Sequence, residues 1–411
     1  MTSPRAESPI VTSNNSPFAG QRKRRILVIF GTRPEAIKLC PLVTTLRSEP
    51  FSSHLETVVC VTAQHREMLD QVLAAFNITP DYDLDLMQPG QTLTALTSRL
   101  LAGLEAIFSE VKPSLAVVQG DTTTTLAGAL GAFYARVPVA HVEAGLRTFD
   151  LDSPFPEEMN RVVTGRLAAL HFAATRWAAE NLEREGVRED SIQVTGNTGI
   201  DAVLTIRDAL GEGRLTGFSG LAEDRSKKLI VVTAHRRESF GEGFRRICEA
   251  LAELANRQDV RIVWPVHPNP NVQSAVDATL RGKTNVILVE PLDYVPFVDL
   301  MRRAYLLITD SGGVQEEGPS LGKPILVLRE KTERPEAVDA GTVKLVGTSR
   351  EAIVREAVRL LEDREGYERM ARLHNPYGDG QACGRIAGRI LSYLQQQTLG
   401  QHAVAAGRPL P

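Results

Sequence analysis

The sequence predicts an α/β protein made of two doubly wound, Rossmann-like domains that face a central cleft. Short runs rich in β-branched residues alternate with helical stretches along nearly the whole chain, which is typical of parallel sheets covered by helices on both faces. These runs fall into two sets, separated by a polar, glycine-containing stretch at residues 211–228. Each set opens with a strand that leads into a turn carrying Arg and Glu, so we expect two domains of one plan.

The first domain is expected to span residues 25–197 and the second residues 198–380. Continuous apolar runs predict six buried strands in the first, at residues 25–30, 57–62, 115–119, 137–143, 170–175 and 192–196. The second set of strands is expected at residues 228–234, 261–267, 285–290, 304–310, 323–328 and 343–347. A last helix, residues 381–398, is expected to return to the first domain. Residues 1–24 and 399–411 are expected to be disordered tails.

Composition excludes several classes of protein. The net charge of −3 over 411 residues argues against nucleic acid as the main partner. No apolar run approaches the length of a membrane span. Residues 1–24 lack an apolar core, so a secretory signal is not expected, although a transit peptide stays open. Four widely spaced cysteines form no metal-binding motif. We therefore expect a cytoplasmic protein without a disulfide framework, a membrane contact or a structural metal.

The segment DSGGVQEE, residues 310–317, follows an apolar strand and predicts an anion site. Gly312 and Gly313 allow close backbone approach, and their N–H groups would begin the next helix, where anions bind. Glu317 lies one turn further on, and its carboxylate could accept hydrogen bonds from two sugar hydroxyls. The alternative is an ordinary turn in which Ser311 caps the helix.

Two further turns carry cations. In GTRPEAIK, Pro34 is expected as the first helical residue, with Arg33 at the mouth of the turn and Lys38 one turn on. Two cations at a helix start oppose its dipole, which indicates a bound anion unless both are solvated. In AHRRE, His235 beside two arginines is expected to stay neutral unless an anion is near, or else to cap a helix. His267 is expected to be a satisfied loop histidine.

Acidic residues stand at the ends of two first-domain strands. Asp121 follows LAVVQG and Glu143 ends VPVAHV, while Glu157 and Glu158 lie in the loop PFPEE. Carboxylates facing cations across a cleft suit proton transfer on an anionic substrate. Helix capping is the alternative for Asp121, and one of the loop acids is expected to be a first-turn helix acid. Neither a dinucleotide fingerprint nor a P-loop is present, so no cofactor is expected.

Taken in order, the motifs FGTRPEAIK, TAQHREMLDQV, GDTTTTL, HVEAGLR, PFPEEMNR, AHRRESFG and TDSGGVQEEGPSLGKP resemble the non-hydrolysing UDP-N-acetylglucosamine 2-epimerases of bacteria. The resemblance runs from about residue 25 to about residue 394. It implies the two-domain GT-B fold of glycosyltransferases, a homodimer, and interconversion of UDP-GlcNAc and UDP-ManNAc for cell-surface polysaccharides. It also implies that neither NAD nor a metal is needed.

The resemblance further implies roles for individual residues. Asp121, Glu143 and Glu157 would handle protons, and His235 would join Arg33, Lys38 and Arg334 in neutralising the diphosphate. Ser311, Gly312 and Gly313 would donate to the diphosphate, Glu317 would hold the ribose and Phe297 the uracil. Leu292 replaces a Gln of some members, so one base contact could be lost. Gln64, His65 and Arg236 match positions near a second UDP-GlcNAc site, where the ligand acts as an activator.

The chemistry favours elimination. The C2 proton is not next to a carbonyl group, so it becomes acidic only as UDP leaves C1 to give a 2-acetamidoglucal. UDP would then add back after a proton reaches the other face of C2. Three alternatives stay open: a hydrolysing 2-epimerase that releases ManNAc and UDP, a GT-B glycosyltransferase, and a regulator that binds the nucleotide sugar without turnover.

Overall fold

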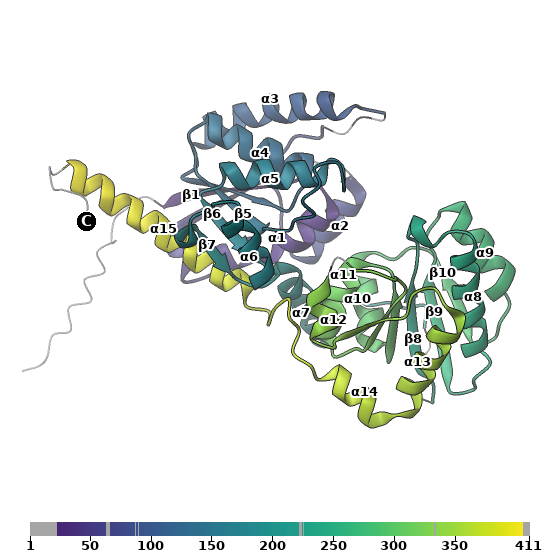
Figure 1. The fold of residues 1–411 in the computed structure, drawn as a ribbon. Coiled ribbons are helices and arrows are strands. Elements are labelled where there is room, and N and C mark those ends of the chain that lie inside the picture. The colour runs from purple at the N-terminus through teal and green to yellow at the C-terminus, as the bar shows by residue number, and fades with distance from the viewer. Residues whose placement is uncertain are drawn as a thin grey trace, which may run out of the picture.

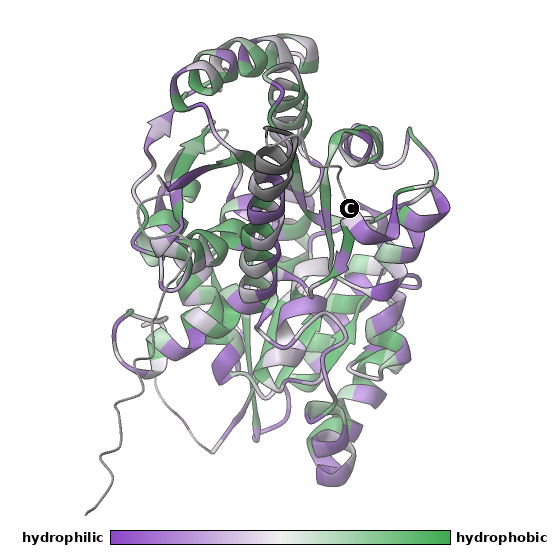
Figure 2. Ribbon diagram, turned by 90° about the vertical axis from the view of Figure 1, so that its left-hand side faces the viewer, coloured by the Kyte–Doolittle hydropathy of each residue, from purple (hydrophilic) through white to green (hydrophobic). Residues whose placement is uncertain are grey.

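The computed structural model describes residues 23–62, 66–86, 88, 90–221, 224, 226–332 and 334–405. Its two lobes each contain one parallel sheet covered by helices (Figure 1). The strands form the apolar centre of each lobe (Figure 2). The expected fold class, two Rossmann-like domains facing a cleft, is therefore confirmed.

The first lobe has the strand order β3-β2-β1-β4-β5-β6-β7, and all neighbours in it are parallel. Its strands are β1 Arg24–Phe30, β2 Leu55–Val61, β3 Tyr82–Asp83, β4 Leu115–Gln119, β5 Val139–Ala144, β6 Leu170–Ala173 and β7 Ile192–Val194. Its helices are α1 Arg33–Leu46, α2 Arg66–Ala75, α3 Leu93–Val111, α4 Thr123–Tyr134, α5 Glu157–Leu167 and α6 Arg176–Arg184, with short 3-10 turns at Phe51–Ser53 and Glu189–Ser191.

The second lobe has the order β10-β9-β8-β11-β12-β13, again parallel throughout. Its strands are β8 Lys228–Thr233, β9 Val260–Pro265, β10 Val286–Val289, β11 Leu306–Thr309, β12 Ile325–Val327 and β13 Val343–Leu345. Its helices are α8 Glu242–Leu254, α9 Pro270–Leu280, α10 Tyr294–Arg303, α11 Gly312–Glu317, α12 Pro335–Asp339, α13 Arg350–Glu362 and α14 Arg364–Ala371, with 3-10 turns at Arg237–Ser239 and Gly318–Leu321.

The chain crosses between the lobes twice, at α7 and in the segment that leads to α15. α7, Thr198–Gly211, packs against α1 on one side and against α10 and α11 on the other. The expected domain boundary at residues 197 and 198 coincides with the start of this helix. α15, Ala382–Ala405, lies along α1 of the first lobe, although the chain reaches it from the second lobe (Figure 1). Ile386, Ile390 and Leu394 bury its apolar face.

The structure differs from the sequence-based prediction at several elements. β3 was not expected, because a two-residue strand between polar segments carries no periodicity. β7 is not buried, since it lies at the sheet edge, where Val194 is 42% exposed. α1 begins at Arg33 instead of Pro34, because Thr32 and Glu35 form a capping box. α15 continues beyond Thr398 to Ala405 instead of giving way to a disordered tail.

None of the described helices is long and apolar enough to cross a membrane.

Candidate active site

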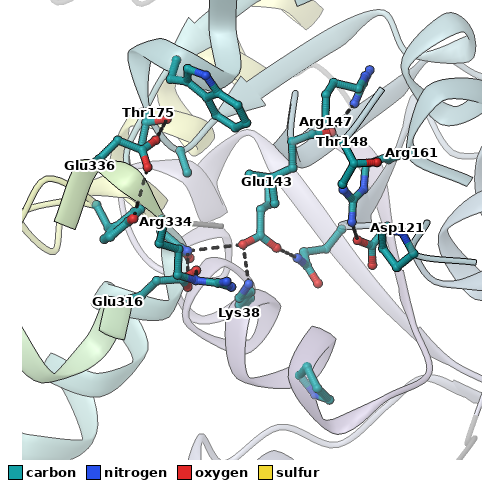
Figure 3. A pocket seen from close by; sticks show the side chains of 18 of the residues that line it. Lys38, Asp121, Glu143, Arg147, Thr148, Arg161, Thr175, Glu316, Arg334 and Glu336 are labelled. Carbon is teal, nitrogen blue, oxygen red and sulfur yellow. Dashed lines mark hydrogen bonds and ion pairs between the residues drawn. The ribbon is translucent and has the colours of Figure 1, made fainter. Parts of the chain in front are cut away.

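A cavity of about 710 Å³ lies between the lobes, at the carboxyl ends of the first sheet's central strands. Lys38, Asp121 and Glu143 line it from the first lobe, and Glu316 and Arg334 from the second. Its position agrees with the rule that open parallel sheets bind ligands beyond the carboxyl ends of their strands. Figure 3 shows Glu143 between the Lys38 and Glu316 group and the Asp121–Arg161 pair.

Glu143 is the central acid of the cavity. Its φ of 59° lies in the left-handed region, and the pairing of β5 with β6 shifts register around it. A non-glycine residue adopts this conformation at a cost of about 1–3 kcal/mol, and such strain concentrates at functional sites. Its carboxylate accepts hydrogen bonds from the Lys38 ammonium and the Gln119 amide. Burial raises the pKa of Glu143, although the charge of Lys38 opposes the rise.

Lys38 is placed by the helix that follows β1. The Glu35 carboxylate accepts from the backbone N–H groups of Gly31 and Thr32, at 3.0 and 2.7 Å, which fixes the start of α1. Lys38 then lies one turn into the helix and meets Glu143. Burial alone would lower the pKa of Lys38, but Glu143 and Glu316 outweigh it, so the pKa is raised and the ammonium stays charged.

Asp121 lies at the other end of the cavity. Its carboxylate accepts from the Arg161 guanidinium at 2.6 Å. Thr122, and not Asp121, caps α4, so helix capping does not explain this carboxylate. The side chain of Asp121 keeps 28% of its surface exposed. It is therefore held by a cation but still accessible from the cavity.

The two loop acids differ. Glu158 is fully buried and accepts from the N–H groups of Thr148 and Phe149, each at 3.0 Å, and from Arg161 at 3.0 Å. It therefore fixes the loop after β5 and orients the guanidinium that holds Asp121. Glu157 is the first residue of α5 and does not line the cavity.

The second lobe contributes an acid and a cation. Arg334 donates through Nε to Glu316 at 2.6 Å. Its guanidinium lies directly over Gly312, since a Cβ built on that glycine would be 2.4 Å from Arg334 Cζ. Burial alone would raise the pKa of Glu316, but Arg334 and Lys38 outweigh it and lower the pKa. The start of α11 and Arg334 thus form one cationic cradle.

The AHRRE turn and the DSGG turn lie side by side. Asp310 is fully buried and accepts from the N–H groups of His235 and Arg236, both at 2.7 Å. Burial lowers the pKa of His235, although Asp310 opposes this, so a neutral imidazole is favoured as expected. His235 stacks on His267, with ring centroids 5.3 Å apart. Ser311 occupies the first cap position of α11, but its hydroxyl makes no capping hydrogen bond.

The remaining predicted residues lie outside the lining of the cavity. His267 is satisfied, since its Nδ1 accepts from the Asn269 N–H at 3.1 Å. Phe297 and Leu292 are partly buried and pack against the apolar core. Burial and the neighbouring Glu316 raise the pKa of Glu317 to about 8, although part of its side chain is accessible. Gln64 and His65 lie outside the described residues. The predicted residues outside the lining are Arg33, Glu157, His235, Arg236, Phe297, Ser311, Gly312, Gly313 and Glu317.

Sequence reasoning missed several cavity residues. The sequence pattern favours Glu317 over Glu316, but the direction of each side chain depends on how the short α11 is rotated, and Glu316 is the one that lines the cavity. Asn197 follows β7 in the motif GNTG, a polar residue at a strand end that could have been noticed. Tyr377 reaches the cavity from the segment before α15, and its hydroxyl donates to Glu336 at 3.2 Å. Thr175 also donates to Glu336, at 3.0 Å, and so links the two lobes.

Within the described residues, no group of three or more His, Cys, Asp or Glu side chains is arranged to hold a metal ion.

Comparison with known proteins places these features in one family. The sequence profile described as UDP-N-acetylglucosamine 2-epimerase matches residues 50–391. Proteins of that name from Salmonella typhimurium and Escherichia coli are 57% identical over 378 residues and 58% identical over 369 residues. These alignments cover 90% and 88% of this chain, and 99% and 97% of the relatives.

Solved structures agree. The crystal structure of UDP-GlcNAc 2-epimerase from Neisseria meningitidis bound to UDP-GlcNAc is 45% identical, with a TM-score of 0.79. The match covers 90% of this chain and all of that one. A glycosyltransferase at 14% identity has a TM-score of 0.59, so it shares the fold alone.

Proposed function

Because the chain belongs to the UDP-N-acetylglucosamine 2-epimerase family, we propose that it interconverts UDP-N-acetylglucosamine and UDP-N-acetylmannosamine without releasing the free sugar. In the proposed route a carboxylate removes the C2 proton while the C1–O bond to UDP breaks. This leaves 2-acetamidoglucal and UDP in the cavity. A second acid then protonates C2 from the opposite face, and a UDP oxygen adds back to C1.

The observation that carries this proposal is the pair Asp121 and Glu143. They stand at the ends of neighbouring strands β4 and β5 and line one cavity with two cations from opposite lobes. Burial raises the pKa of Glu143, whose side chain is 10% exposed, whereas the side chain of Asp121 is 28% exposed. Two acids in different surroundings suit one proton removal and one proton delivery.

The cations support retention of the leaving group. Lys38 and Arg334 are each paired with an acid, and an incoming diphosphate would offer both a stronger partner. We assign Arg33 and His235 to the same diphosphate, with the backbone of Ser311, Gly312 and Gly313. Glu317 is assigned to the ribose and Phe297 to the uracil. Glu157 stays in the assignment as a third acid, at the start of α5 next to the cavity-lining residues Pro154 and Arg161.

The test is exchange of the C2 proton with solvent. Purified protein would be incubated with UDP-GlcNAc in D2O, and the products followed by NMR and mass spectrometry. We expect UDP-ManNAc and UDP-GlcNAc that both carry deuterium at C2. Glu143→Gln and Asp121→Asn should each slow exchange at least about a hundredfold, the usual contribution of a proton-transfer group. Glu180→Gln, on the surface of α6, is the matched control and should exchange normally.

Each alternative function predicts a different outcome of this experiment. Free ManNAc with an equal amount of UDP would show a hydrolysing 2-epimerase. An unexchanged C2–H together with sugar transfer to an added acceptor would show a glycosyltransferase. Binding of UDP-GlcNAc without any exchange would show a regulator.

Assembly as a homodimer belongs to the same proposal. Phe133 and Tyr134 at the end of α4 are 57% and 70% exposed, which offers an apolar contact for a second copy. Light scattering should give twice the mass of 44.9 kDa, and a monomer at micromolar concentration would reject this part.

A further inference from the structure

Asn197 joins the acid of the first lobe to the acid of the second. Its Nδ2 lies 3.0 Å from Glu316 Oε2 and 3.3 Å from Glu143 Oε1. Asn197 is 3% exposed, so these hydrogen bonds are screened from water. An amide nitrogen carries two N–H donors, and here each one points at a different carboxylate.

The orientation of this amide is fixed from its other end. Asn197 Oδ1 accepts from the Gly199 N–H at 2.8 Å and caps α7. The backbone N–H of Asn197 donates to the Tyr377 carbonyl at 2.7 Å. Turning the amide over would place its oxygen against two carboxylates and lose the cap. Asn197 therefore presents donors, and only donors, to the two acids.

Glu143 and Glu316 share some of their ion-pair and hydrogen-bond partners. Lys38 faces both of them, and Arg334 holds Glu316. If a diphosphate binds to these cations, the Asn197 amide still joins the two carboxylates to each other, while the Gln119 amide holds Glu143 alone. Asn197 also lies where the two connections between the lobes come together: it caps α7, and its backbone is hydrogen-bonded to Tyr377 in the segment before α15. Its geometry thus depends on how the lobes are placed relative to one another.

We propose that Asn197 is a positioning residue that ties the carboxylate of Glu143 to the diphosphate cradle at Glu316, so that the acid which handles the C2 proton is aligned only when the cradle is in place. This inference rests on the proposed function, because it assigns Glu143 to proton transfer. Asn197 itself need not touch the substrate. Its contribution would be seen in turnover much more than in binding of UDP.

Two substitutions separate this role from helix capping. Asn197→Ser keeps a good capping residue for α7 but is too short to reach the carboxylates. Asn197→Asp keeps both shape and cap but puts an acceptor where two donors were. Asn197→Ser should melt within a few degrees of the parent, whereas Asn197→Asp places a third carboxylate beside two buried acids and should fold but melt at a lower temperature. We expect Asn197→Ser to slow C2 exchange roughly tenfold to hundredfold, the loss for a hydrogen bond to a charged group. Its Kd for UDP should change less than about threefold.

Asn197→Asp should also move the pH profile. A third carboxylate beside Glu143 and Glu316 raises the apparent pKa of the group, so the acidic limb of kcat should shift to higher pH. Other charged and titratable groups face the pair and stay unchanged in both variants. These groups are Lys38, Asp121, Glu317, Arg334, Glu336 and Tyr377.

The outcomes are distinguishable from failure of the proposed function. If the parent protein exchanges C2–H but Asn197→Ser does so at the same rate, the positioning role is rejected while the epimerase proposal stands. The same holds if Asn197→Asp loses activity without any shift of the acidic limb. A parent protein that shows no exchange at all would reject the proposed function instead.

Discussion

Replacing Gly312 with alanine should displace Arg334 without disturbing the fold. The new Cβ would lie 2.4 Å from Arg334 Cζ and 2.6 Å from both terminal nitrogens. Those atoms form the end of a flexible side chain, so the guanidinium can move while the backbone stays. It must move by about 1 Å, because ordinary contact begins at 3.4 Å. That movement breaks the 2.6 Å hydrogen bond from Arg334 Nε to Glu316.

The expected loss of affinity follows from the proposed contact between Arg334 and the diphosphate, which the displaced guanidinium can no longer make. A hydrogen bond between charged groups contributes about 1.5–3 kcal/mol, and each 1.4 kcal/mol is about tenfold in affinity. The Kd for UDP should therefore rise roughly tenfold to hundredfold. Alanine favours a helix over glycine by up to about 1 kcal/mol, which offsets only part of the loss of the Arg334–Glu316 pair, so the melting temperature should fall by a few degrees while the fold is kept.

Gly313→Ala is the matched control. It makes the same chemical change one residue later in α11, where the nearest atom to the new Cβ is 4.0 Å away. Both variants keep the backbone N–H groups at the helix start. Titration calorimetry with UDP and thermal unfolding would be measured for all three proteins. Unchanged UDP affinity in Gly312→Ala, or an equal loss in Gly313→Ala, would show that Arg334 over Gly312 is not part of the diphosphate cradle.

Three further predictions concern stability. Burial raises the pKa of Glu317 from 4.5 to about 8, so the folded protein keeps a proton that the unfolded chain releases, and stability falls as pH rises through that window. Glu317→Gln should therefore melt at a higher temperature than the parent at pH 8 but at about the same temperature at pH 5; an equal effect at both would contradict the raised pKa. Glu158→Ala should lower the free energy of unfolding in urea by about 3 kcal/mol or more, because it leaves Arg161 without its buried ion-pair partner Glu158. Glu157→Ala should change the free energy of unfolding little. Gly145→Ala should prevent stable folding, because its Cβ would be 2.1 Å from a backbone carbonyl; Gly186→Ala, also at positive φ but in open space, should cost only about 1 kcal/mol.

The sequence was sufficient for the fold because buried parallel strands are continuous apolar runs. Each of the expected strands has a counterpart within a few residues. β3 was not predicted, because Tyr82 and Asp83 form a strand through their pairing with β2 and not through their own composition. The end of α15 was placed too early because residues 398–405 contain no proline to stop the helix.

The site was predicted in part. Lys38, Asp121, Glu143 and Arg334 line one cavity, since strand ends and helix starts can be located from sequence. The choice between adjacent acids cannot be made that way, because neighbouring helical side chains point about 100° apart. Asn197 acquires its role only through carboxylates that are distant in sequence.

The path of α15 sets the order in which the protein can be completed during synthesis. The face of α1 that it covers is made early, whereas Ile386, Ile390 and Leu394 leave the ribosome only after the second lobe. Until then the nascent first lobe carries an uncovered apolar stripe. The first sheet can form while the second is being translated, but α15 can cover α1 only after the second lobe has been made. A nascent chain arrested in α14 should therefore be a better chaperone client than one arrested after α15.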